Sequence, residues 1–388
     1  MKNGMESNVT MRSVLCAGAL ALLGAHAFAQ NPNASQATRI YNRIAGVPPS
    51  AAVLAQMMAT DPVSAALIAT NDPAFYNNTI RNLATPWTNR DQTVFAPLND
   101  YTATVVGMVR DNVPFNTLLS ADLLYVADSA SGAPAYSPAN NDMYQAMDDN
   151  NVDLKAHLVP STQSALTGIP SSATAGVMTT RGAASAFFVN GTNRAMFRFT
   201  MMNHLCSDLM TVMDTTRPPD RIRQDVSRSP GGDSRVFLNN CIGCHAAMDP
   251  MVQAFAYYNY DPTALQLVYT PGQTQAKYHI NTGNFPYGFV TPDDSWNNRW
   301  RTGPNALLGW SSSLPGSGNG AKSLGQELAN SQAFANCQVQ KVFQAICLRP
   351  PSNAADRSAA AQITQDFQSG GYNMKQVFAQ TAVYCMGN

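Results

Sequence analysis

The sequence predicts a mainly α-helical protein, because apolar residues recur at helical spacing along most of the chain and no alternating, strand-like run dominates. At 388 residues the chain is long enough for two domains, or for one large domain with a sizeable core. Hydrophobic residues make up 45% and charged residues 12%, a balance typical of a globular rather than a disordered chain. No internal repeat is found.

The charge balance excludes some classes of partner. Lys and Arg together number 24, as do Asp and Glu, so the formal net charge is zero. A nucleic-acid-binding protein would show a basic excess or a basic stripe, so no nucleic-acid partner is expected. Beyond the N-terminus no stretch approaches the roughly 18 apolar residues of a membrane span, and none is expected.

Residues 1–29 are predicted to be a signal peptide. Arg12 precedes an apolar run, which ends in the small-x-small sequence Ala27-Phe28-Ala29. Cleavage is expected after Ala29, and export to the periplasm follows from it. Cys16 as a lipoprotein anchor is the less favoured alternative, because Leu15 stands where a small residue is needed.

The first half of the mature chain is expected to consist of short helices separated by Asp-Pro breakers. The expected helices are 51–58, 75–83, 101–113, 118–126 and 193–213, with a loop over 129–141. Residues 215–232 carry three Pro, four Arg and two Gly, so an irregular connection and a domain boundary are expected there. Residues 30–215 then form a helical domain of unknown role.

Residues 216–388 are expected to form a second domain that ends in helices. Residues 283–320 are expected to be irregular, and their glycine run lacks the Lys-Ser/Thr of a phosphate-binding loop. The helical pattern resumes after Lys322 and is broken by Arg349-Pro350-Pro351 and again by Gly370-Gly371. The expected helices are 324–347, 359–367 and 373–386.

The sequence Cys241-Ile242-Gly243-Cys244-His245 is the signature of covalent c-type haem attachment. Cysteines three residues apart on a helix reach the two vinyl groups at one edge of the porphyrin, and the adjacent imidazole reaches the iron. The motif is expected at the end of a helix capped by Asp233 or Ser234. One haem c is therefore predicted, with His245 as the proximal iron ligand. Residues 216–388 are accordingly expected to form a cytochrome c-like haem domain with C-terminal helices.

Two other interpretations of the motif are weaker. A zinc site needs a second pair of Cys or His at ligand spacing, which Cys337 and Cys347 do not supply. A thioredoxin-type cysteine pair needs a βαβ context and has no use for the adjacent histidine.

The second axial ligand is less well defined. Met374 is the first choice, because it opens the C-terminal helix just after Gly370-Gly371, as the ligand methionine does in small cytochromes c. An open iron site remains an alternative. The other candidates are His279, Met201, Met202 and His204. Four arginines before the motif could bind haem propionates, but the aspartates among them favour a solvated, ion-paired loop. These are Arg217, Arg221, Arg223 and Arg228.

Four cysteines outside the motif and the signal peptide predict two disulfides in an oxidising compartment. They are Cys206, Cys337, Cys347 and Cys385. An unbroken helix from 334 to 347 would separate Cys337 from Cys347 by ~15 Å, whereas bridged Cα atoms lie within ~7 Å. Each of these two cysteines is therefore expected to pair with Cys206 or Cys385. Free buried thiols are the alternative.

Three blocks of the chain carry a resemblance to a known group. They are AGVMT at 175–179 with NRA at 193–195, RPP at 217–219 leading to CIGCHAAMDP at 241–250, and the helical region 334–385. From about Asp72 onward the chain resembles the planctomycete-type cytochrome c domain families of unknown function. The resemblance implies haem attachment at Cys241, Cys244 and His245, which match its motif one for one. Ala195, Met251 and Val252 depart from the usual pattern.

These observations predict an exported electron-transfer protein with one haem and a redox partner protein, either a carrier or the electron-delivering subunit of an oxidoreductase. The first alternative is a haem enzyme, peroxidase- or oxygenase-like, with an open iron site. The second makes residues 30–215 a module that docks a partner. No substrate is indicated.

Overall fold

The computed structural model describes residues 30–387, and the predicted signal peptide lies outside this range. Helices make up 54% of the structure and the strands are few and short, which confirms the mainly α prediction. Within the described residues no helix combines the length and apolar character needed to cross a membrane.

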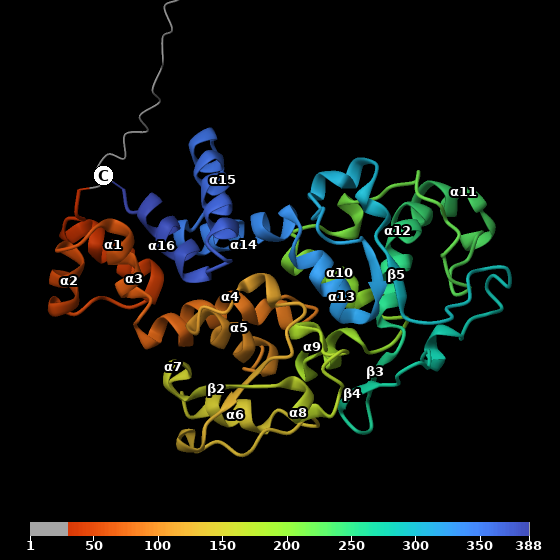
Figure 1. Ribbon diagram of the computed structural model, residues 1–388, viewed down its shortest axis with the longest axis horizontal. Helices are drawn as coiled ribbons and strands as arrows, with labels where there is room; N and C mark the ends of the chain where they lie inside the picture. Colours follow the sequence, from red (N-terminus) through yellow and green to blue (C-terminus); the bar gives the residue numbers. More distant parts are fainter. Residues whose placement is uncertain (1–29, 388) are drawn as a thin grey trace, which may run out of the picture.

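One end of the molecule is built from helices of both termini, which lie side by side (Figure 1). Its helices are α1 (Ala34–Ala45), α2 (Ala51–Met58), α3 (Pro62–Ala69), α14 (Gln332–Cys347), α15 (Ala354–Ser369) and α16 (Met374–Tyr384). Their N-termini are capped by side chains: Asn33 and Asn353 form capping boxes, and Asp61 and Ser331 accept backbone N–H groups. Helix α16 packs on α3, so the C-terminal helices do not simply extend the segment around the haem motif.

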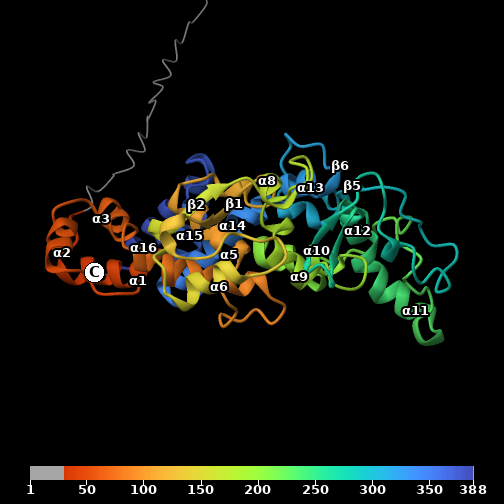
Figure 2. The ribbon, with the colours of Figure 1, turned by 90° about the horizontal axis from the view of Figure 1, so that it is seen from below.

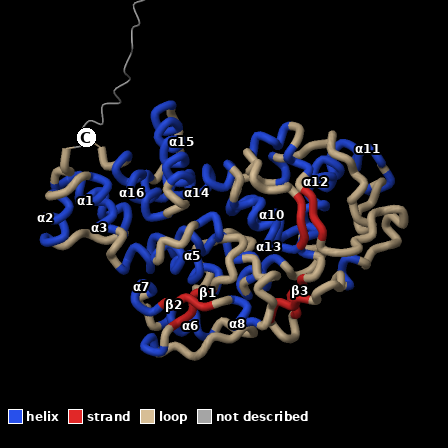
Figure 3. The backbone as a smooth tube through the Cα atoms, in the orientation of Figure 1, coloured by secondary structure: helices blue, strands red, loops and turns tan. Residues whose placement is uncertain are grey.

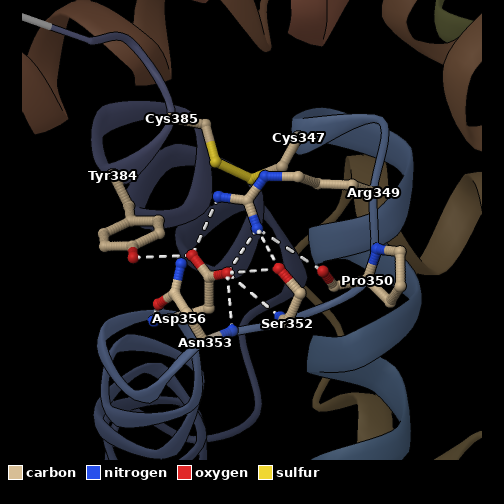
Figure 4. Close-up of a disulfide and its surroundings, with 8 residues drawn as sticks. All are labelled: Cys347, Arg349, Pro350, Ser352, Asn353, Asp356, Tyr384 and Cys385. Carbon is tan, nitrogen blue, oxygen red and sulfur yellow. Dashed lines mark hydrogen bonds and ion pairs between the residues drawn. A yellow bond between two sulfur atoms is a disulfide. The ribbon is translucent and has the colours of Figure 1, made fainter.

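A buried carboxylate joins the start of α15 to α16 (Figure 4). Asp356 accepts hydrogen bonds from the backbone N–H of Ser352 at 3.0 Å and from the Tyr384 hydroxyl at 2.8 Å, and it forms an ion pair with Arg349. The Arg349 hydrogen bond holds the pKa of Asp356 far below its usual range. The Cys347–Cys385 disulfide lies beside this cluster and ties α14 to the end of α16.

The middle of the molecule surrounds one buried helix. Helix α5 (Asp100–Arg110) is buried over almost its whole length, and the Asp100 carboxylate accepts the backbone N–H groups of Arg181 and Gly182. The elements around it are α4 (Arg81–Ala84), α6 (Asp142–Asp149), α7 (Leu154–His157), α8 (Gln163–Thr167), α9 (Arg181–Phe187) and the antiparallel pair β1 (Leu124–Ala127) and β2 (Leu158–Ser161).

The other end of the molecule carries the cysteine motif (Figures 1 and 2). Its elements are α10 (Arg194–His204), α11 (Ser234–Val236), α12 (Ile242–Val252), α13 (Gly320–Ala329) and two antiparallel pairs, β3 (Tyr258–Asp261) with β4 (Gln266–Tyr269) and β5 (Ser295–Asn297) with β6 (Ser317–Asn319). Figure 3 shows how short these strands are beside the helices. The main buried apolar cluster extends from Ala37 to Ala382, and the boundary near residue 215 stays a prediction.

Three helix predictions are wrong in their extent. The predicted helix 324–347 divides into α13 and α14, because the Ser331 side chain caps the start of a second helix. The predicted helix 193–213 ends at His204, because Cys206 adopts a left-handed backbone (φ 51°) and is held by a disulfide. The predicted helix 118–126 gives way to strand β1, where Tyr125 packs on the bare backbone of Gly107. A Cβ on Gly107 would lie 2.2 Å from the Tyr125 ring. This packing against α5 decides between helix and strand, and a periodicity argument does not include it.

Two disulfides form, as predicted. Cys206 pairs with Cys337 and Cys347 pairs with Cys385, with Cα atoms 5.3 and 5.6 Å apart. The structure thus selects one of the two pairings that the sequence left open. Helix α14 runs unbroken between Cys337 and Cys347, which is the reason that these two cannot pair with each other.

A buried histidine predicts a dependence of stability on pH. His204 lies at the end of α10 with Nε2 2.6 Å from the Tyr101 hydroxyl and its ring against Trp87. Burial, reinforced by the charge of Lys341, lowers the pKa of His204 from 6.5 to about 3. Below pH ~6.5 His204 becomes protonated in the unfolded chain but stays neutral in the folded chain. The free energy of unfolding therefore falls as the pH falls.

Between pH 7 and pH 5 this histidine should cost about 2 kcal/mol of unfolding free energy. Urea unfolding of the native chain and of His204→Gln at both pH values checks it, because the other histidines contribute equally to both proteins. The variant should lose about 2 kcal/mol less than the native chain over this interval. Equal losses in the two proteins would contradict the assignment.

Candidate haem-attachment site

The cysteine motif lies in a nearly continuous helix. Asp233 caps its start by accepting the Arg235 N–H at 2.9 Å, so one of the two predicted caps is confirmed. The chain then passes through α11, one π-helical turn (Phe237–Cys241) and α12 without leaving right-handed helical angles. The motif therefore lies within the helix, and the prediction that it lies at a helix end is wrong. Single π-turns are frequent at functional sites.

Three side chains of the motif share one partly open face of this helix. Cys244 and His245 are the two residues of α12 that are not buried, and Cys241, directly before it, is also half-buried. Residues three and four positions apart lie on the same side of a helix. Both thiols are unbonded, although the other four cysteines of the described chain form disulfides. The structure thus presents two thiols and an imidazole together.

Gly243 faces away from this side. A Cβ on Gly243 would lie 3.1 Å from Cε of Met213, and the Gly243 carbonyl accepts the Asp214 N–H at 2.9 Å. The absence of a side chain at Gly243 therefore leaves room for Met213 and Thr215, which pack behind the helix. Position i+2 lies almost opposite Cys241 on a helix, so Gly243 does not share the face that carries the thiols.

A buried carboxylate orients the imidazole. His245 Nδ1 lies 3.2 Å from Oδ1 of Asp249, one helical turn later. This contact leaves Nε2 as the nitrogen that can bind a metal. Metal-binding histidines usually hold their other ring nitrogen against such a partner, which fixes the ring and the tautomer. The motif is therefore followed by a residue placed to position the ligand.

Asp249 is in turn held by two arginines. Arg194 donates to it through Nε at 2.8 Å and Nη2 at 2.9 Å, and Arg223 Nη2 lies 3.7 Å away. Arg194 also contacts Asp225 at 2.7 Å. Burial alone would raise the pKa of Asp249, but the arginines and His245 outweigh it and hold this pKa well below its usual range. The carboxylate therefore stays ionised and keeps facing His245.

The arginines before the motif divide between the two predicted roles. Arg217 pairs with Asp214, and Arg223 is buried in the network around Asp249. Arg221 lies over the Phe289 ring with an unpartnered buried nitrogen. Arg228 lies over the Phe237 ring and donates only to backbone carbonyls. Within residues 30–387, Arg221 and Arg228 form no ion pair, so they are the two that remain available to a propionate.

Met374, the predicted distal ligand, is not brought to the motif. It is buried at the start of α16, which packs on α3, whereas α12 lies at the other end of the molecule in both views (Figures 1 and 2). The physical reason is that α16 joins the N-terminal helices instead of the helix that carries the motif. Met201 and His204 are buried, and His279 is exposed on a loop.

Sequence reasoning missed Met210. Its side chain is 68% exposed, and the carbonyl of the preceding Leu209 lies 3.6 Å from the Cys244 sulfur. Met210 therefore directly follows a residue that contacts the motif, in the sequence segment that was expected to be helical. The left-handed turn at Cys206 directs the segment that contains Leu209 and Met210 back along α12. No local sequence pattern predicts this turn.

The residues present fit a covalently held haem. The porphyrin supplies four nitrogen ligands, so the protein needs to provide only two anchoring thiols and one axial imidazole nitrogen. A bare structural zinc ion would need four protein ligands. In the part of the chain that the structure describes, no three His, Cys, Asp or Glu side chains gather to hold a metal ion.

Comparison with known proteins gives no relative. No protein-family model, no curated protein and no solved structure matches this chain. The similarity of the three sequence blocks to the planctomycete-type cytochrome c families therefore stays a prediction, and the site is interpreted from its own residues.

Proposed function

We propose that this chain is an exported monohaem c-type cytochrome that transfers electrons, with haem attached at Cys241 and Cys244 and His245 as the proximal ligand. The observation that supports it most is the helix face on which two unbonded thiols and an imidazole with a free Nε2 lie together. A haem bound there supplies a one-electron iron couple. A redox partner protein in the periplasm would exchange the electron.

The surroundings of His245 support a stable proximal bond. Asp249 takes the Nδ1 side of the ring, and the Arg194 fork prevents the carboxylate from turning away. Such second partners of a metal ligand typically contribute 10- to 100-fold, as an order of magnitude, to metal affinity. Because the cysteines are only half-buried, one edge of an attached haem would remain near the solvent, where a partner could reach it.

The haem-enzyme alternative is favoured by one finding, namely that Met374 lies at the other end of the molecule. Under the carrier proposal a second axial bond is expected from Met210, which is exposed and directly follows Leu209, whose carbonyl contacts Cys244. Under the alternative this position is open to a small ligand.

Optical spectra of the haem-loaded protein with and without carbon monoxide separate the two functions. The carrier proposal predicts a low-spin haem that does not bind carbon monoxide. Met210→Ala should become high-spin and bind it, while Met374→Ala, the matched control, should leave the spectrum unchanged. A native protein that binds carbon monoxide readily would favour the enzyme and contradict the carrier.

A further inference from the structure

A second site lies away from the haem motif, where the N-terminal helices meet α14. A cleft of about 510 Å³ opens there, a size typical of small-molecule sites. Its walls come from α1, α4, the turn after α4, the end of α10 and α14. None of its lining residues belongs to the motif or to the network around Asp249.

The cleft has two cations and no carboxylate. Arg43 and Lys341 both line it, and the rest of the lining is neutral. Within residues 30–387 neither side chain takes part in an ion pair or donates a hydrogen bond. The Lys341 ammonium lies 5.5 Å from the centre of the Trp87 ring, and burial lowers its pKa. A partly buried cation without an anion is costly, and an anionic ligand relieves that cost.

Two amide groups of the cleft, those of Asn203 and Gln92, are held by hydrogen bonds. Asn203 is buried and donates through Nδ2 to the Trp87 carbonyl at 3.1 Å, while its Oδ1 accepts from Gln92 Nε2 at 2.9 Å. Gln92 adopts a left-handed backbone with φ 51°, a strained conformation that tends to persist at functional sites. Its amide is therefore held at the rim in one orientation.

The disulfide Cys206–Cys337 keeps the two walls together. Cys206 follows Asn203 by three residues, and Cys337 precedes Lys341 by one helical turn. The Cys337 sulfur also lies 3.8 Å from the Asn203 carbonyl. The amide wall on α10 and the cation on α14 are thus joined covalently, so the cleft is preformed.

The remaining lining is apolar in part, beside the polar residues Thr79, Asn82 and Gln344. Leu83, Pro86, Trp87 and Ala345 contribute the apolar part. A bare inorganic anion would leave these side chains facing water, whereas a planar apolar body would cover them. Guanidinium groups bind carboxylates through two parallel hydrogen bonds.

We propose that the cleft between α1, α4 and α14 binds a small organic carboxylate with a planar apolar body, the carboxylate against Arg43 and Lys341 and the body against Leu83, Pro86 and Ala345. This site is independent of the haem proposal, because it shares no residue with the motif.

Isothermal titration of the full chain with benzoate tests the site. Benzoate should bind, and benzamide, which has the same shape without the charge, should bind at least 10-fold more weakly. Lys341→Gln and Arg43→Gln should each weaken benzoate binding by about 10-fold, the loss of a charge-assisted contact of roughly 1.4 kcal/mol. Lys341→Arg keeps the cation and should retain binding. Arg357→Gln, at an exposed arginine outside the cleft, is the matched control.

Three results would overturn the proposal. These are the absence of benzoate binding at millimolar concentration, binding that both charge-removing variants leave unchanged, and binding of inorganic phosphate as tight as that of benzoate. Circular dichroism of each variant separates a lost ligand from a lost fold. If Lys341→Gln does not fold, benzoate binding by Lys341→Arg and by Arg43→Gln still tests the requirement for the two cations.

Discussion

Replacing Asp249 with alanine should lower the free energy of unfolding by about 3–5 kcal/mol, because removal of one partner leaves buried charges uncompensated. The Asp249 carboxylate is fully buried, and Arg223 beside it is 2% exposed and has an unpartnered Nε. Without Asp249 the two arginines would lie close together with no carboxylate between them, and His245 would lose its Nδ1 partner. This one substitution removes the contacts of Asp249 with Arg194, Arg223 and His245.

Denaturant unfolding of the haem-free protein measures this effect without any contribution from the cofactor. Asp249→Asn, which keeps some hydrogen bonds but not the charge, should fall between the native chain and Asp249→Ala. Asp233→Ala is the matched control, since Asp233 pairs with Arg235, whose side chain is 81% exposed. That variant should cost about 1 kcal/mol, mainly from the lost helix cap, because the ion pair is exposed. A loss at Asp249 as small as the loss at Asp233 would contradict the network described here.

Removing the Cys206–Cys337 disulfide should cost about 4–5 kcal/mol, because this bond closes a loop of 131 residues in the unfolded chain. The double variant Cys206→Ser/Cys337→Ser leaves no unmatched thiol. In the chain-entropy account, the stabilisation comes from the restriction of the unfolded state. The measurement is denaturant unfolding under non-reducing conditions.

The second disulfide supplies the comparison. Cys347–Cys385 closes a loop of 38 residues, so Cys347→Ser/Cys385→Ser should cost somewhat less, about 4 kcal/mol. Loss of Cys206–Cys337 should also weaken benzoate binding in the cleft, whereas loss of Cys347–Cys385 should not. If both double variants were as stable as the native chain, the disulfides would not form in solution as the structure has them.

The sequence was a good guide wherever a feature depends on neighbours along the chain. The helix through Cys241 and His245, its cap at Asp233 and the unbroken α14 all follow from spacing and capping rules that act within a few residues. The exclusion of a Cys337–Cys347 bond followed from helix length alone. These predictions used only distances that local geometry fixes.

The parts that failed depend on contacts between distant segments. The contact of Asp249 with Arg194 and Arg223 joins residues more than 20 positions apart, and nothing local announces it. Met374 was predicted as the distal ligand by analogy with small cytochromes c, whereas in this chain its helix packs against α3. Strand β1 was predicted as a helix because the apolar run that contains Tyr125 fits both helical and strand periodicity. Only the contact of Tyr125 with Gly107 decides between the two.

The most direct test of the haem proposal is the intact mass of the mature chain, expressed with a signal peptide in a periplasm that has haem-maturation machinery. The mature chain should be heavier by the mass of one haem, and this increase should survive denaturation. A single-thioether spectrum is expected for Cys241→Ala and for Cys244→Ala, and no covalent haem for the double variant. A native chain that matures without added mass, or a double variant that still carries covalent haem, would contradict the haem proposal.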